Sequence, residues 1–166
     1  MTVDEDGRTA GTMAKLAAHE GDGVLHRAFS VFLFDRDGRV LLQRRAEDKH
    51  HFRGRWSNTC CSHPLPGETV TQAASRRLAE ELGIAADAEE VGTFTYRAAD
   101  PDSGLVEVEF DHVLVGHHEG AIAPDPAEVG AVRWVHLDEL RRTIDSDPDS
   151  FTPWLSLALD VVEAHR

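Results

Sequence analysis

The segment 67–83 constrains the fold most, because it carries the start, the stop and the buried face of one helix. Gly67-Glu68-Thr69 precedes the run, and Gly83 stands where the helix should stop. Four apolar residues recur at spacings that stripe one face: Ala73, Ala74, Leu78 and Leu82. The pattern predicts an amphipathic helix that begins at Gly67-Glu68-Thr69 and ends at Gly83.

Strand patterns lie on both sides of this helix. The run 28–34 is apolar and β-rich, residues 35–38 form a turn sequence, and residues 39–43 continue as a second strand, which is a hairpin pattern. Further patterns predict strands near 90–97, 106–116 and 130–136, and short helices from Asp138 and from Pro153 onward. Strands interspersed with helices indicate the α/β (α+β) class.

The length of the chain indicates one domain. A chain of 166 residues can bury a single sizeable core, and the sequence shows no repeat, low-complexity tract or linker that would divide it. We expect residues 11–166 to form that domain and the polar residues 1–10 to be frayed.

Charge and composition argue against several classes of partner. The formal net charge of −13 opposes binding to nucleic acid or to anionic membranes, because both need a basic face. No stretch approaches the roughly 20 apolar residues of a membrane span, and the first residues lack the features of a secretory signal. Cys60 and Cys61 are adjacent, so reduced thiols are expected. We therefore expect a cytoplasmic protein, with no obligatory protein partner evident from the sequence.

Two sets of residues alternate along the strand predicted near 106–116. Val106, Val108 and Phe110 share one face, and Glu107, Glu109 and Asp111 share the other. A solvent-exposed polar face explains this alternation as well as a functional site does. The strand pattern alone leaves both interpretations open.

The region around the predicted helix carries a spaced motif: Glu68 is followed after seven residues by Arg76-Arg77-Leu78-Ala79-Glu80-Glu81-Leu82-Gly83-Ile84. This spacing resembles the Nudix box of Nudix hydrolases. In that family the box presents glutamates to magnesium ions that hold a diphosphate. Here Ser62 replaces the first glycine of the box, and Arg77 replaces a metal-binding glutamate. Because Arg77 puts a cation where the box has a metal-binding carboxylate, we expect diphosphate binding rather than hydrolysis.

Three further motifs are residues 58–64 (Asn-Thr-Cys-Cys-Ser-His-Pro), residues 96–101 (Tyr-Arg-Ala-Ala-Asp-Pro) and residues 107–109 (Glu-Val-Glu). In this combination and order they resemble the type I isopentenyl-diphosphate isomerase family. The resemblance runs from about Gly11 to Trp154. It implies a Nudix-like α/β/α sandwich with a mixed β-sheet. It also implies interconversion of isopentenyl and dimethylallyl diphosphate in isoprenoid biosynthesis.

The resemblance implies two proton-handling residues. Cys61 matches the catalytic thiol and Glu109 the opposing acid, with Cys60 as a bystander. A reaction through a carbocation-like species needs such groups on both sides of a flat apolar centre. For Cys61 alone, an inert buried thiol would be the commoner outcome.

The resemblance also implies two metal sites. One holds Mn²⁺ or Zn²⁺ through three histidines and two glutamates, which here are His19, His26, His63, Glu107 and Glu109. The other is a Mg²⁺ ion that travels with the diphosphate and contacts Glu81. Each histidine taken alone would more readily be a surface or core residue.

Substrate contacts are implied at six further positions. Basic residues that match the family are Lys15, Arg45, Lys49 and Arg77, although a solvated surface role is an alternative for each. Trp154 would supply a π-face for the carbocation, or else pin the last helix in the core. Tyr96 would assist near Glu109 through its hydroxyl.

Two other functions stay open at this point. Glu68, Glu80 and Glu81 would also suit a Nudix-type diphosphate hydrolase, against which Arg77 counts. A non-catalytic diphosphate sensor would keep the pocket without turnover. The sequence discloses neither the metal in the histidine site nor the oligomeric state.

Overall fold

A computed structural model describes residues 1–166, apart from the side chain of Lys15. The strands of the sheet are β1 (Thr2–Val3), β2 (Thr9–Gly11), β3 (His26–Phe34), β4 (Arg39–Arg45), β5 (Trp56–Ser57), β6 (Cys60–Ser62), β7 (Ala88–Ala99), β8 (Val106–His117) and β9 (Val129–His136). The helices are α1 (Lys15–His19), α2 (Val70–Leu82), α3 (Leu137–Ser146), the 3₁₀ turn η1 (Pro148–Ser150) and α4 (Trp154–His165). Among the described residues, no helix is both long and apolar enough to span a membrane.

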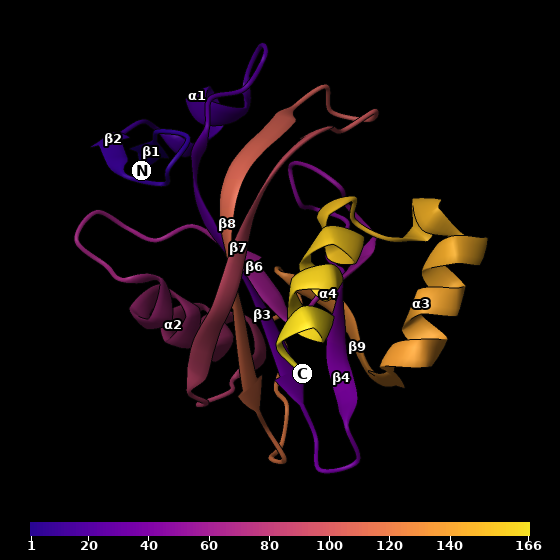
Figure 1. Ribbon diagram of the computed structural model, residues 1–166. Helices are drawn as coiled ribbons and strands as arrows, with labels where there is room; N and C mark the ends of the chain where they lie inside the picture. The colour runs from indigo at the N-terminus through magenta and orange to yellow at the C-terminus, as the bar shows by residue number, and fades with distance from the viewer.

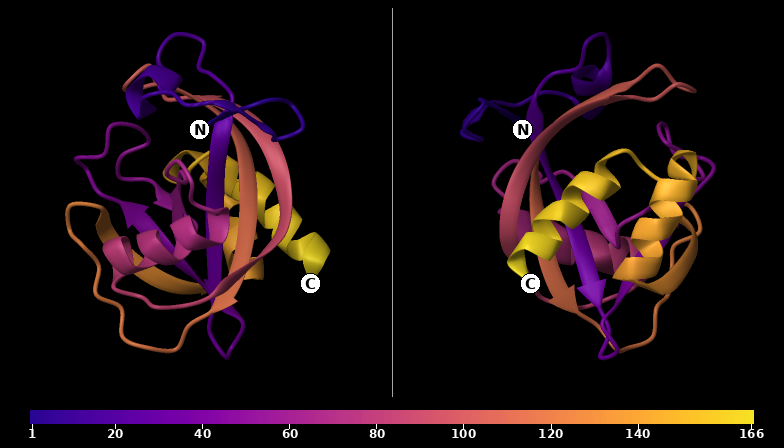
Figure 2. Two further views of the ribbon diagram at one scale, coloured as in Figure 1. Left: turned by 90° about the vertical axis from the view of Figure 1, so that its left-hand side faces the viewer. Right: turned by 45° about the vertical axis from the view of Figure 1, so that its right-hand side comes forward.

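The strands form one mixed sheet with helices on both faces. β3 lies at its centre, where it pairs in parallel with β8 over nine residue pairs and in antiparallel with β6. α2 lies on one side of this sheet and α4 on the other, and the long β7–β8 hairpin curves around α4 (Figures 1 and 2). The predicted α/β/α sandwich is confirmed.

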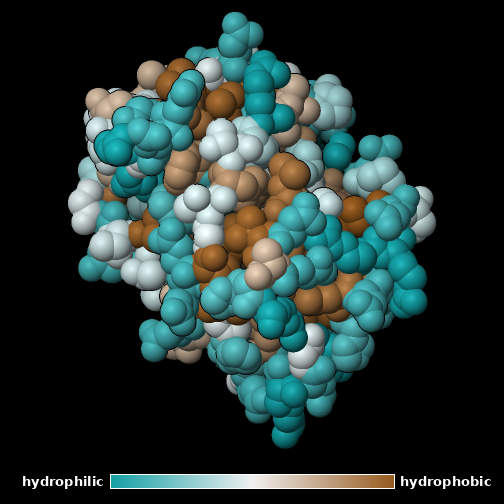
Figure 3. Space-filling view, viewed as in Figure 1, coloured by the Kyte–Doolittle hydropathy of each residue, from teal (hydrophilic) through white to brown (hydrophobic). Residues whose placement is uncertain are grey.

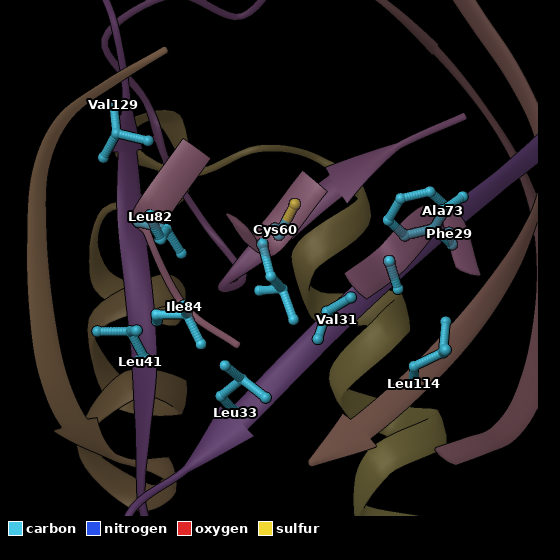
Figure 4. Packing of buried hydrophobic residues seen from close by; sticks show 12 residues of the cluster. Phe29, Val31, Leu33, Leu41, Cys60, Ala73, Leu82, Ile84, Leu114 and Val129 are labelled. Atoms are coloured by element: carbon cyan, nitrogen blue, oxygen red, sulfur yellow. The ribbon is translucent and has the colours of Figure 1, made fainter. Parts of the chain in front are cut away.

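Alternation along β3 divides the core into two layers. Phe29, Val31 and Leu33 point to the α2 side, where they pack with Leu78 and Leu82 of the helix (Figure 4). The residues between them belong to the other layer: Phe32 and Phe34 pack with residues of α4 such as Leu155 and Leu159. In the view of Figure 3 apolar atoms gather where α4 lies against β7, and polar residues cover most of the rest.

The capping residues in the sequence predicted both ends of α2 correctly. The Thr69 hydroxyl accepts a hydrogen bond from the backbone N–H of Gln72, and the Gln72 side-chain oxygen accepts one from the Thr69 N–H, which is a capping box. At the other end Gly83 adopts φ +64°, a conformation that favours glycine and ends the helix. The helix therefore begins and ends as its sequence predicts.

The predicted hairpin between β3 and β4 forms only at its turn. Gly38 has φ +74° and donates its N–H to the carbonyl of Asp35 at 3.1 Å. Beyond the turn the two strands share one register pair, Phe34 with Val40, and then separate. β4 continues along β9 instead. The segment with β5 and β6 lies between the separated strands, because β6 pairs with β3 and β5 pairs with β4.

The first ten residues, which we expected to be frayed, pair with the sheet. β1 pairs antiparallel with β2, and Thr2 lies opposite His26 at the start of β3. Val3 is buried, and its N–H bonds to the carbonyl of Leu25 at 3.1 Å. One apolar side chain and these backbone hydrogen bonds attach the segment beside the site.

Candidate active site

Strand register brings three predicted residues to one face of the sheet. His26 at the start of β3 lies opposite Glu109 of β8, and Ser30 of β3 lies opposite Cys61 of β6. Paired residues share a face, and so do residues two or four apart on one strand. Cys61 and Glu109 therefore face the same side, with β3 between their strands.

The carboxylate face of β8 is buried. Glu107, Glu109 and Asp111 expose 2%, 6% and 1% of their surface, whereas Val108 and Phe110 on the opposite face are half-buried. A solvent-exposed polar face, one of the two interpretations of this alternation, is therefore wrong. Burying three carboxyl groups side by side is costly unless cations or hydrogen bonds compensate them.

Five residues from four segments form a cluster that can hold a divalent metal ion. One donor atom from each lies within 4.8 Å of all the others, and the residues are His19, His26, His63, Glu107 and Glu109. His19 ends α1, and His63 follows β6. The cluster joins parts of the chain that are up to 90 residues apart.

The orientation of the His26 ring fits this interpretation. Its Nδ1 lies 2.7 Å from the carbonyl of Val24, which can only accept, so Nδ1 carries a hydrogen. Nε2 faces the cluster, 3.0 Å from Nε2 of His63 and 3.5 Å from Oε1 of Glu109. Imidazole nitrogens and carboxylate oxygens directed at one point suit a divalent cation.

Neighbouring polar groups hold Glu109 in its ionised form. Burial alone would raise the pKa of this carboxyl, but its interactions with His26 and Glu107 lower the pKa below the usual value. Tyr96 adds a hydrogen bond from its hydroxyl to Oε2 at 2.6 Å. The predicted proximity of Tyr96 to Glu109 is therefore present in the structure.

The thiol of Cys61 lies beside an aromatic cluster. The cluster comprises Phe52, Tyr96 and Trp154, and Cys61 packs against it. Burial raises the pKa of Cys61 to about 12, and the positive charge of Arg45 opposes the shift only in part. The side chain therefore stays a protonated thiol in this surrounding. Its neighbour Cys60 points into the α2 core and is fully buried.

Trp154 is both a core residue and a wall of the site. Its indole N–H donates to Asn58 at 3.2 Å, and the residue is 3% exposed at the start of α4. The guanidinium of Arg45 lies 5.7 Å from the ring centre. Both roles considered for Trp154 thus agree with its position.

Two adjoining cavities lie at this end of the sheet. The inner one, about 60 Å³, is lined by Arg45, Lys49, His50, His51, Cys61, Ser62, His63, Arg77, Tyr96, Glu107, Glu109 and Trp154. The outer one, about 380 Å³, shares Lys49, Ser62, His63 and Arg77 with it and includes Arg76. The thiol and the carboxylate thus line one cavity, and basic residues line its connection to the outer one.

The basic residues differ in their contacts. Lys49 forms an ion pair with Glu128, and Arg77 lies 3.3 Å from the same carboxylate. Arg45 is 7% exposed and donates to the backbone of His51. The side chain of Lys15, the fourth predicted basic contact, lies outside the described part of the structure.

Glu81 is buried and already paired. Its Oε2 accepts a 3.0 Å hydrogen bond from Gln43, and its Oε1 accepts one from Arg77 Nε at 3.1 Å. Among the described side chains, it is not part of the five-residue cluster. A magnesium ion at Glu81 would therefore compete with the guanidinium of Arg77.

Sequence analysis missed two residues that contact this site. His51 lies 2.6 Å from Glu107, and its sequence surroundings carry no pattern that sets it apart from the neighbouring His50. Asp111 accepts a hydrogen bond from Ser30 at 2.8 Å, while burial and the charge of Glu109 raise its pKa well above the usual value. Only the alternation along β8 placed Asp111 on the face of the glutamates.

Comparisons with known proteins agree with this architecture. Residues 24–155 match the NUDIX domain family. Among solved structures, a Deinococcus radiodurans protein superposes with a TM-score of 0.76 at 18% identity, covering 99% of this chain and 98% of the other. The MutT protein from Methanosarcina mazei Go1 gives 0.68 at 15% identity, covering 86% and 96%. These two likenesses concern the fold alone.

Curated relatives are more similar in sequence. An isopentenyl-diphosphate Delta-isomerase of Nocardia farcinica is 54% identical over 98% of this chain and 93% of its own length. Proteins of the same name from Streptomyces avermitilis and Halorhodospira halophila are 52% and 48% identical, covering 95% and 92% of this chain and 80% and 87% of theirs. The chain therefore belongs to the NUDIX domain family and, within it, to the isopentenyl-diphosphate Delta-isomerases.

Proposed function

We propose that the protein interconverts isopentenyl diphosphate and dimethylallyl diphosphate in isoprenoid biosynthesis. The observation that carries the proposal is the inner cavity, where the thiol of Cys61 and the carboxylate of Glu109 share walls with Tyr96 and Trp154. Moving a double bond by one position requires a proton to be added at one carbon and removed from another. A thiol and a carboxyl group around an apolar space can supply both functions.

In this proposal Cys61 and Glu109 exchange protons with the hydrocarbon part of the substrate. The aromatic cluster excludes water from the cation-like species that forms between the two proton transfers. The indole of Trp154 stabilises its positive charge, a contact that contributes about 2 kcal/mol when the cation is desolvated. Tyr96 orients the carboxylate of Glu109 through its 2.6 Å hydrogen bond.

In the same proposal, the metal ion bound by the five-residue cluster acts on the carboxylate of Glu109. A Zn²⁺ or Mn²⁺ ion held by the three histidines and two glutamates would fix the orientation of this carboxylate and lower its proton affinity. The nitrogen-rich donor set favours these ions over Mg²⁺.

We assign the diphosphate to the outer cavity. Lys49 and Arg77 lie where the two cavities meet, and Arg45 lines the inner one. A Mg²⁺ ion would accompany the diphosphate and contact Glu81 once Arg77 turns from this carboxylate to the phosphate. Lys15 stays a predicted contact, and a cytoplasmic location stays a prediction.

The box glutamates are arranged unfavourably for the alternative, a Nudix-type hydrolase. Arg76 binds Glu68 at 2.7 Å, and Arg77 binds Glu80 at 2.8 Å. Since Arg77 also pairs with Glu81, guanidinium groups occupy the carboxylates that a hydrolase would offer to magnesium. We therefore place isomerisation first.

One incubation distinguishes the two activities. The purified protein is mixed with isopentenyl diphosphate, Mg²⁺ and Zn²⁺ or Mn²⁺, and the mixture is followed by ¹H and ³¹P NMR. We expect dimethylallyl diphosphate to accumulate while the diphosphate signals keep their total intensity. Release of inorganic phosphate without isomerisation would contradict the proposal and favour hydrolysis, and binding without either change would favour a sensor.

A further inference from the structure

The segment between β4 and β5 carries a buried histidine outside the five-residue metal cluster. His51 is 8% exposed, although it lies in a loop and next to the exposed His50. Loop side chains are usually solvated, so the burial of His51 calls for a specific contact.

That contact is with the carboxylate of Glu107. Nε2 of His51 lies 2.6 Å from Oε1, and Nε2 of His19 lies 2.9 Å from Oε2. The rings of His51 and His19 also stack, with centroids 5.4 Å apart and planes inclined by 21°. Because a carboxylate oxygen can only accept, a hydrogen bond across this contact requires a hydrogen on Nε2 of His51. The two oxygens of Glu107 are thus divided between His51 and the cluster side.

We infer that His51 is a positioning residue for the metal centre, which donates to Oε1 of Glu107 so that Oε2 is directed at the metal ion. The inference rests on the proposed function, because it concerns the metal that serves Glu109. A hydrogen bond to the far oxygen of a ligating carboxylate fixes its rotation and favours coordination through one oxygen.

The backbone of His51 links this centre to the thiol. Its carbonyl accepts hydrogen bonds from Arg45 at 3.0 Å from Nη2 and 3.3 Å from Nε. Nη1 of the same guanidinium lies 3.8 Å from the sulfur of Cys61. His51 therefore contacts Glu107 through its side chain, and its carbonyl contacts Arg45, which lies beside the thiol of Cys61.

The next residue holds His51 in place. Phe52 has φ +48°, a conformation that persists only where the surroundings impose it. Its N–H donates to Asp100 at 3.2 Å, and its ring meets Trp154 edge to face with centroids 5.4 Å apart. Contacts with Asp100 and Trp154 therefore hold the loop between β4 and β5 in place next to His51.

A set of variants separates the hydrogen bond from the volume of the ring. His51→Ala removes both, His51→Phe keeps a ring that can stack on His19 but cannot donate, and His51→Gln restores a donor near the position of Nε2. Affinity for Zn²⁺ and Mn²⁺ is measured without substrate by competition with a chromophoric chelator, and His50→Ala is the control for this affinity. Circular dichroism melts check folding.

We expect His51→Ala and His51→Phe to lose about 10-fold or more in metal affinity, with His51→Gln recovering most of the loss and His50→Ala matching the wild type. Wild-type affinity in His51→Ala or His51→Phe would overturn the inference, as would equal losses in His51→Phe and His51→Gln. If His51→Ala does not fold, the comparison of Phe with Gln decides alone. Failure of the wild type to isomerise the substrate would instead overturn the proposed function.

Discussion

The hydroxyl of Tyr96 donates a 2.6 Å hydrogen bond to Oε2 of Glu109, while Oε1 of the same carboxylate lies 2.8 Å from Nε2 of His63. The two residues are register partners on β7 and β8, so the sheet itself sets their separation. Burial and the charge of Glu109 raise the pKa of Tyr96 well above its usual value, which keeps the hydroxyl protonated as a donor.

Removing this hydroxyl should slow the reaction without unfolding the protein. Tyr96→Phe keeps the ring that packs against Trp154 and loses only the donor to Glu109. A hydrogen bond to a charged group contributes about 1.5–3 kcal/mol, so we expect kcat to fall roughly 10- to 100-fold and the melting temperature to fall by several degrees, with the fold retained. Steady-state kinetics measure this, and an unchanged kcat would mean that Tyr96 does not orient Glu109.

Changing Trp154 should separate catalysis from stability. Trp154→Ala should lower kcat about 30-fold through loss of the π-face, and should cost about 3–5 kcal/mol of unfolding free energy because the indole is buried. Trp154→Phe keeps a smaller π-face and most of the volume, so its kcat should fall less. Kinetics and urea unfolding measure the two effects. Equal kcat values for Ala and Phe would assign Trp154 a packing role only.

The local parts of this structure could be predicted from the sequence. The stop at Gly83 and the stripe from Ala73 to Leu82 are encoded within a few residues, and α2 forms where they predict it. The turn at Gly38 is also local, but the pairing of its strands is not. β3 leaves β4 because β6 pairs with it at Phe29–Val31, and its other edge pairs over nine residue pairs with β8, about 80 residues further along the chain. No local pattern specifies such a parallel partner.

Parts of the site could be predicted for a different reason. The five cluster residues were named from the resemblance to a family, and the structure brings their donor atoms within 4.8 Å of one another. Alternation along β8 grouped Glu107, Glu109 and Asp111 correctly but did not decide which face is buried. His51 escaped notice because its contact with Glu107 depends on how a loop folds back, and one histidine in such a loop resembles any other.

Stripping the metal should abolish turnover and lower the melting temperature. A ligand that binds only the folded protein stabilises it by about 2.7 kcal/mol at a 100-fold excess over Kd, and the chelated protein loses this contribution. We expect Zn²⁺ or Mn²⁺ to restore both properties to protein treated with a chelator. Metal analysis confirms the stripping. Full turnover by protein shown to be metal-free would exclude a role for the cluster in the reaction.

The ion pair of Glu68 with Arg76 should make stability depend on pH. The hydrogen bond from Arg76, followed by one from the Leu65 N–H, lowers the pKa of Glu68 from 4.5 to about 2. A lowered folded-state pKa stabilises the protein above about 4.5, and this contribution is lost as the pH falls towards 2. Urea unfolding of the wild type and of Glu68→Gln should therefore differ most at pH 7, and the difference should shrink steadily as the pH falls from about 4.5 towards 2. If the difference in unfolding free energy between the two proteins grows as the pH falls, the ion pair does not stabilise the fold in the way predicted.

Deuterium exchange tests the central claim most directly. Wild-type protein, Cys61→Ala and Glu109→Gln are each incubated with isopentenyl diphosphate, Mg²⁺ and Zn²⁺ or Mn²⁺ in heavy water, and ²H NMR follows the label. We predict that the wild type introduces deuterium into both isomers, and that both variants keep the folded circular dichroism spectrum of the wild type but introduce almost none. Full label incorporation by either folded variant would contradict the claim that this thiol and this carboxylate carry the protons.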